Sequence, residues 1–99
     1  MTAIDYGTCN VCDKEPAVGV ASSTLGPMSF AYGRECLKAN AEPYGPLVTM
    51  VAMCGGRANL ADWVPPIIEG SLRVAGKSME DFDADVAQET AELQELGAL

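Results

Sequence analysis

Two short stretches decide the fold of this chain: CNVC at residues 9–12 and GREC at residues 33–36. A Cys-x-x-Cys segment curls into a knuckle that can aim both thiolates at one metal ion, and two such knuckles complete the tetrahedral site of structural zinc. About twenty residues normally separate the two knuckles. Cys12 and position 33 have this spacing, so Cys9, Cys12 and Cys36 are predicted to be metal ligands.

Position 33 is a glycine where the pattern requires a further cysteine, so the fourth ligand has to come from elsewhere. Cys54 can supply it if the segment before Cys54 folds back over the knuckle. A carboxylate such as that of Asp13 or Glu35, or a water molecule, can fill the position instead. A third alternative is that no metal binds and the cysteines are small buried apolar residues. Cys54 is the leading candidate, so the predicted Zn²⁺ ligands are Cys9, Cys12, Cys36 and Cys54.

The order of knuckle, hairpin and helix, with a ligand on the first turn of the helix, resembles the treble-clef zinc finger. The stretches at residues 6–12, 32–37 and 41–44 are similar to small zinc-finger proteins of bacteriophages and actinobacteria, most of which have no assigned function. The resemblance covers residues 6–45 and implies that Cys9, Cys12 and Cys36 bind zinc. Gly33 departs from the family pattern, whose second knuckle reads Cys-x-x-Cys.

The chain is predicted to be a single α+β domain of residues 1–99. Residues 6–45 would hold the knuckle, a hairpin and a short helix, and residues 46–99 the helical part. Residues 17–22 and 28–32 have the period of two that is typical of strands, and the turn-forming sequence TLGP lies between them. These two segments are predicted to pair as a β-hairpin.

Four helices are predicted after the hairpin, with boundaries marked by residues that cap or interrupt helices. Pro46 can open the second helix, Gly76 can end the third, and Ser78 with Asp81 forms a capping box for the last. The β-branched residues of the second helix leave a strand as the alternative there. Residues 57–64 are predicted to be irregular or one helical turn. The predicted helices span residues 34–41, 46–53, 67–75 and 79–96.

Acidic side chains gather on the last predicted helix. The chain has a net charge of −8, and residues 78–99 hold seven of its 14 acidic residues with no lysine or arginine. The acidic face is either a solvated surface, or a surface that binds a basic partner protein or mimics the phosphates of a nucleic acid. Glu89 interrupts the apolar stripe of this helix, which argues against dimerisation through it. The stripe consists of Met79, Phe82, Val86, Leu93 and Leu96.

Several functional classes are excluded or disfavoured by composition. The chain has no histidine, which excludes Ser-His-Asp and Cys-His nucleophiles. A thioredoxin-like Cys-x-x-Cys begins a long helix, whereas Pro16 and a predicted strand follow this one. The first residues lack the features of a signal peptide, and no apolar run is long enough to span a bilayer. A cytoplasmic location is expected, where the thiols stay reduced.

These features favour a non-catalytic protein-binding module with a structural metal site. If the chain is phage-encoded, it would act as an inhibitor of a host protein or defence system in the host cytoplasm. The expected partner is a protein with a basic surface, and no membrane is involved. The alternative is a nucleic-acid-associated zinc finger. It is disfavoured because phosphate contacts supply most nucleic-acid affinity and the chain has only six basic residues. That alternative would use Lys14, Arg34, Lys38 and Arg57.

Overall fold

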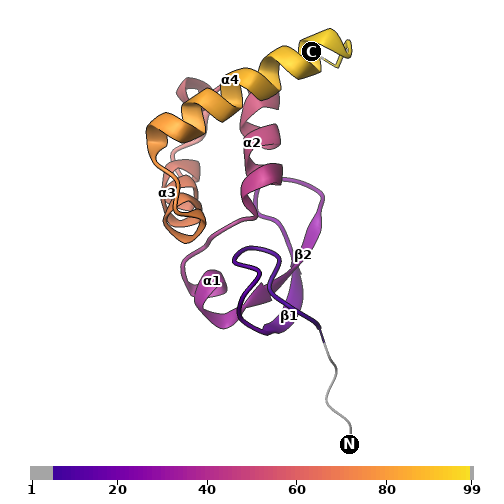
Figure 1. Ribbon diagram of the computed structural model, residues 1–99, viewed down its shortest axis with the longest axis vertical. Helices are drawn as coiled ribbons and strands as arrows, with labels where there is room; N and C mark the ends of the chain where they lie inside the picture. The colour runs from indigo at the N-terminus through magenta and orange to yellow at the C-terminus, as the bar shows by residue number, and fades with distance from the viewer. Residues whose placement is uncertain (1–5, 99) are drawn as a thin grey trace, which may run out of the picture.

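In the part of the chain that the structure describes, an antiparallel hairpin is followed by four α-helices, which confirms the predicted α+β class. The computed structural model describes residues 6–98. The knuckle, the hairpin and the first helix form one end of the molecule, and the other helices form the opposite end (Figure 1). The strands are β1 (Ala17–Ser22) and β2 (Ser29–Gly33). The helices are α1 (Arg34–Lys38), α2 (Tyr44–Met53), α3 (Val64–Ala75) and α4 (Met79–Glu95), with a 3₁₀ turn, η1 (Arg57–Asn59), between α2 and α3.

The knuckle pairs with the hairpin through backbone and side-chain hydrogen bonds. Ala31 of β2 lies opposite Val20 of β1. On the other edge of β2, Ala31 faces Asn10 of the knuckle. The Asn10 N–H donates to the Ala31 carbonyl at 2.8 Å, and the Ala31 N–H donates to Asn10 Oδ1 at 2.7 Å. This edge of β2 is therefore covered by the knuckle, which holds Cys9 and Cys12 beside the sheet.

Two helices begin earlier than predicted because prolines fit inside their first turns. α2 begins at Tyr44 rather than at Pro46, and α3 begins at Val64 rather than at residue 67. The first N–H groups of a helix have no partner within it, so a proline there loses no hydrogen bond. α1 ends at Lys38, earlier than predicted, and Asn40 turns the chain with a φ of 55°. The strand alternative for α2 was wrong.

The predicted capping box at the start of α4 is confirmed. Ser78 Oγ accepts a hydrogen bond from the Asp81 N–H at 3.0 Å, and Asp81 Oδ2 accepts one from the Ser78 N–H at 3.2 Å. The second bond lowers the pKa of Asp81. Gly76 ends α3 in the left-handed region, with a φ of 68°, as predicted. These contacts between near neighbours set the sharp turn from α3 into α4.

The main apolar core lies among α2, α3 and α4. Phe82 of α4 is fully buried at its centre, and the ring of Tyr44 packs edge-on against it with centroids 6.2 Å apart. Met79 and Leu93 extend the predicted stripe at its margins, whereas Leu96 is 81% exposed. Leu96 follows the end of α4, which reaches beyond α2 (Figure 1). The buried members of this core are Leu47, Val48, Val51, Ala52, Val64, Ile68, Leu72, Phe82 and Val86.

The second apolar cluster is much smaller and lies beneath the knuckle. Its buried members are Cys9, Cys36 and Ala41. α3 closes it from the side, and a Cβ on Gly70 would stand 2.4 Å from the carbonyl oxygen of Ala39, so the close approach requires a glycine. Two of the three buried residues are cysteines, so the knuckle half has little apolar core of its own. The partly buried neighbours are Val11, Cys12, Ala39 and Val74.

A buried carboxylate joins the two ends of the molecule. Glu42, between α1 and α2, accepts hydrogen bonds from the Tyr32 hydroxyl at 2.6 Å and from the Thr24 hydroxyl at 3.0 Å. Its backbone N–H donates to Ser71 Oγ of α3 at 2.8 Å. Burial, and then the contact with Glu42, raises the pKa of Tyr32. These bonds tie the hairpin to α3 and fix how the knuckle half sits on the helical half.

Candidate metal centre

Three cysteines and one glutamate bring four possible metal donors together beside the hairpin. The sulfur atoms of Cys9, Cys12 and Cys36 and a carboxylate oxygen of Glu15 all lie within 4.8 Å of one another. Tetrahedral zinc with Zn–S bonds of about 2.3 Å places its sulfurs about 3.8 Å apart, so a small contraction of this group fits the ion. The three cysteines of the predicted site are therefore found together, and the group is compatible with a metal site.

The knuckle is shaped by its own backbone. The Asp13 N–H bonds to the Cys9 carbonyl at 3.0 Å, and Asp13 adopts a left-handed φ of 57° that closes the turn. The Val11 N–H approaches Cys9 Sγ at 3.4 Å, and the Glu15 N–H approaches Cys12 Sγ at 3.5 Å. This last contact is the main cause of a lowered pKa at Cys12. The turn thus aims two thiols to one side and favours a thiolate at Cys12.

Cys36 reaches the group from the first turn of α1 and is 3% exposed. Burial raises the pKa of the Cys36 thiol, since a thiolate in apolar surroundings loses its solvation. A coordinated metal ion offsets this, because it deprotonates the thiols that bind it. Metal binding would therefore release the Cys36 proton.

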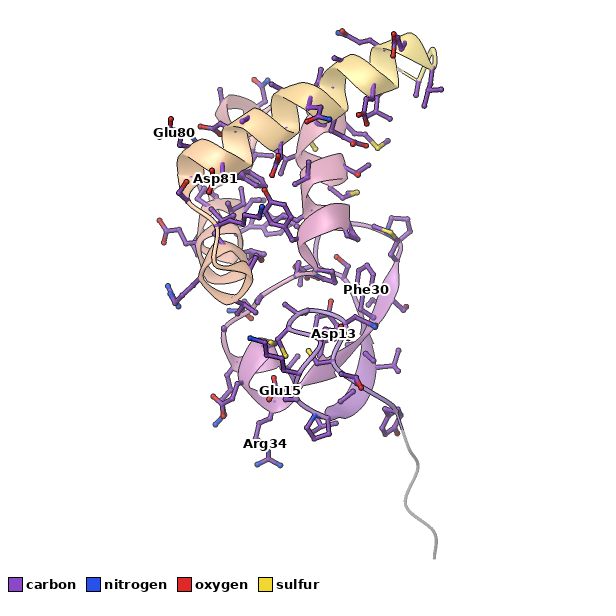
Figure 2. All side chains as sticks on the ribbon, viewed as in Figure 1. Asp13, Glu15, Phe30, Arg34, Glu80 and Asp81 are labelled. Carbon is purple, nitrogen blue, oxygen red and sulfur yellow. The ribbon has the colours of Figure 1, made fainter. Side chains whose placement is uncertain are left out.

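Glu15 is a possible metal donor that was not predicted from the sequence. Its Oε1 accepts a hydrogen bond from the Cys36 N–H at 3.1 Å, and its Oε2 accepts one from the Glu35 N–H at 3.4 Å. The Cys36 contact is the main cause of the lowered pKa of Glu15. Figure 2 shows Glu15 in the end of the molecule that carries α1 and the hairpin. The signal in the sequence was a carboxylate three residues after Cys12 together with a glycine at position 33.

The carboxylates considered from the sequence are not in this group. Asp13 is exposed at the tip of the knuckle, and Glu35 is exposed with its carboxylate 3.9 Å from Lys38 Nζ. Neither belongs to the set of donors that lies within 4.8 Å. Glu15 differs from both because it is half-buried and because its side chain meets the start of α1.

Cys54, predicted to be the fourth ligand, is not placed with the other three cysteines. It is the exposed C-cap residue of α2, outside the group of donors. α2 starts beside the knuckle half and runs away from it toward α4, and its ten residues span about 15 Å (Figure 1). Cys54 instead lines a pocket of about 210 Å³ with Met50 and Trp63.

Comparison with protein-family models, curated protein sequences and solved structures found no match. Within residues 6–98, no helix is long and apolar enough to cross a membrane.

The acidic face of α4 is partly engaged within the molecule. Asp83 forms a two-pronged ion pair with Arg57 of η1, with distances of 2.6 and 2.7 Å, and Arg57 lowers the pKa of Asp83. Asp85 and Glu89 accept hydrogen bonds from hydroxyl groups of α2. Part of the acidity therefore attaches α4 to its neighbours. The hydroxyl donors are Tyr44 and Thr49, respectively.

Proposed function

We propose that this chain is a non-catalytic protein-binding module whose knuckle half is held in shape by one zinc ion. The observation that supports a metal site is the convergence of four possible donors from the knuckle and its surroundings and from α1. These donors are Cys9, Cys12, Cys36 and Glu15. Thiolates are soft ligands, and a tetrahedral set dominated by sulfur is typical of zinc. A zinc ion would also supply the stability that the small apolar cluster beneath the knuckle cannot provide.

A structural role for the zinc fits this donor set better than a catalytic one. Catalytic zinc keeps a coordination position open for water or substrate, whereas structural zinc has four protein ligands. Here four protein donors are available, and Cys9 and Cys36 are buried. The ion would cross-link the knuckle to α1 and so hold the hairpin between them.

Native mass spectrometry tests the metal. The chain purified without chelator is expected to carry one zinc ion, and the bare mass is expected after treatment with a strong chelator. A bare mass before and after chelation, even with zinc supplied in the buffer, would contradict the proposal.

For the partner, the pocket beside Trp63 is the best supported surface. Trp63 is 55% exposed at its rim, and Leu25, Met50 and Leu60 supply apolar walls. Tryptophan and methionine are enriched where proteins bind one another. Asp62 stands in the chain between two residues that line the pocket, Ala61 and Trp63, and the whole chain carries a charge of −8. The complementary occupant is therefore an apolar side chain on a basic protein surface. In a phage-encoded chain that partner would be a host protein that it inhibits.

Substitution of Trp63 tests this surface. Trp63→Ala is expected to abolish capture of a basic protein from host lysate, because an aromatic anchor supplies much of the affinity of such an interface. Leu96→Ala is the matched control, since Leu96 is also exposed but lies at the far end of α4. Capture that survives Trp63→Ala, or that is replaced by salt-sensitive DNA binding, would contradict the proposal.

The nucleic-acid alternative is not proposed. Arg57, one of its four candidate residues, is engaged by Asp83, and Lys38 lies 3.9 Å from Glu35. The other two of these four candidates, Lys14 and Arg34, offer few phosphate contacts.

A further inference from the structure

Gly33 leaves a space that the side chain of Glu15 fills. A Cβ built on Gly33 would stand 2.2 Å from Cγ of Glu15, and 2.3 Å from both its Cδ and its Oε1. Real Cβ atoms do not approach other atoms so closely. Position 33 is also where the zinc pattern places its third cysteine. The glutamate therefore occupies the space in which that cysteine side chain would begin.

Glu15 is also linked to each of the three cysteines. Its carbonyl accepts a hydrogen bond from the Cys9 N–H at 2.9 Å, its N–H approaches Cys12 Sγ, and its carboxylate accepts from the Cys36 N–H. The backbone of Glu15 is thus tied to the knuckle, and its carboxylate is oriented by the first N–H groups of α1. A carboxylate can accept about four hydrogen bonds, and the two amide N–H groups of α1 use only two of these positions. Lone pairs remain for a metal ion.

We propose that Glu15 is the fourth zinc ligand and that it replaces, from the other end of the hairpin, the cysteine missing at position 33. This inference rests on the proposed zinc site and specifies its donor set as three thiolates and one carboxylate. Such a set has the same formal charge as four thiolates. Its oxygen is a harder ligand, so the site binds zinc more weakly than a four-cysteine site and discriminates less against other divalent ions. Gly33 is required because Glu15 needs its space.

Cobalt titration of the whole chain tests the ligand. Co²⁺ takes the place of zinc, and its thiolate charge-transfer band grows with the number of bound sulfurs. The wild-type chain is expected to bind one Co²⁺ with the intensity of three thiolates. Glu15→Gln keeps the size of the side chain and is expected to weaken binding by at least about tenfold, since even outer-shell partners contribute 10–100-fold to metal affinity. Cys54→Ser is the matched control and is expected to bind like the wild type.

A ligand exchange provides the second test. Gly33→Cys alone is expected to disturb the site, because its Cβ would collide with Glu15. Glu15→Ala removes that collision and the fourth ligand together. The double variant Gly33→Cys with Glu15→Ala is expected to bind more tightly than Glu15→Ala, with a band that rises to the intensity of four thiolates. The double variant is expected to regain metal binding, and a folding defect could only reduce binding, so a folding defect cannot produce this result.

The outcomes separate the two proposals. A wild-type chain that binds neither Co²⁺ nor zinc would overturn the zinc site and, with it, the role of Glu15. A wild-type chain that binds metal while Glu15→Gln binds equally well, with an unchanged spectrum, would overturn the role of Glu15 alone. Weakened binding in Cys54→Ser but not in Glu15→Gln would assign the fourth position to Cys54 instead.

Discussion

Removal of zinc is expected to unfold the knuckle half while the helical half keeps its core. The apolar cluster beneath the knuckle buries only Cys9, Cys36 and Ala41, whereas nine buried residues support α2, α3 and α4. Free zinc at a thousand times its dissociation constant stabilises the bound state by about 4 kcal/mol. Hydrogen exchange resolved by segment should therefore show a roughly thousandfold loss of protection in β1 and β2 after chelation. Amides of α2 and α4 should keep most of their protection.

Two variants sharpen this expectation. Cys36→Ser should give the same exchange pattern without chelator, because it removes a buried ligand. Cys54→Ser should respond to chelation like the wild type, since Cys54 is exposed and lies outside the donor group. Equal loss of protection in all helices and strands would show that the two halves unfold as one unit. Unchanged protection after complete loss of metal would show that the cysteines stabilise the knuckle as buried thiols.

Phe82→Ala is expected to cost about 3–5 kcal/mol in the free energy of unfolding, the usual range for a phenylalanine removed from a core. Phe82 is fully buried and lies among the side chains that α2 and α3 contribute to the main core. Its loss also removes the edge-on contact with Tyr44. A small domain is stable by only about 5–15 kcal/mol, so this variant would lose much of the total. Urea unfolding followed by circular dichroism measures the change.

The control for this variant lies on the same chain segment. Leu96→Ala also truncates a large apolar side chain near the end of α4, but Leu96 is exposed, so the expected change is within about 0.5 kcal/mol. Similar losses for both variants would mean that the overhanging end of α4 is buried in solution, for example against another molecule. A small effect at Phe82 would contradict the placement of α4 on α2.

Features that depend on near neighbours were predictable from the sequence. The knuckle, the capping box at Ser78 and the helix end at Gly76 each involve residues within four positions of one another, and the structure has all three. The hairpin and the four helices were also predictable, because alternation and helical periodicity are local patterns. The errors at the starts of α2 and α3 came from prolines, which stop a helix in its interior but not in its first turn.

The fourth donor could not be read from the sequence, because it depends on contacts across the hairpin. Glu15 and Gly33 are eighteen residues apart in the printed sequence and meet only when β1 pairs with β2 in the observed register. Likewise, Cys54 appeared available as a ligand until the direction of α2 placed it at the other end of the helix. The acidic residues of α4 looked like one surface, yet Asp83 and Asp85 bond to neighbouring elements.

The sequence by itself thus determined that Cys9, Cys12 and Cys36 belong to one site, since their spacing and the hairpin between them bring the knuckle to the start of α1. Only the tertiary structure decided that Glu15 completes the donor group and that Cys54 stands apart from it. The physical reason is that local geometry depends on the identity of adjacent residues. Which distant side chain fills a space depends instead on strand register, helix direction and the absence of a Cβ at Gly33.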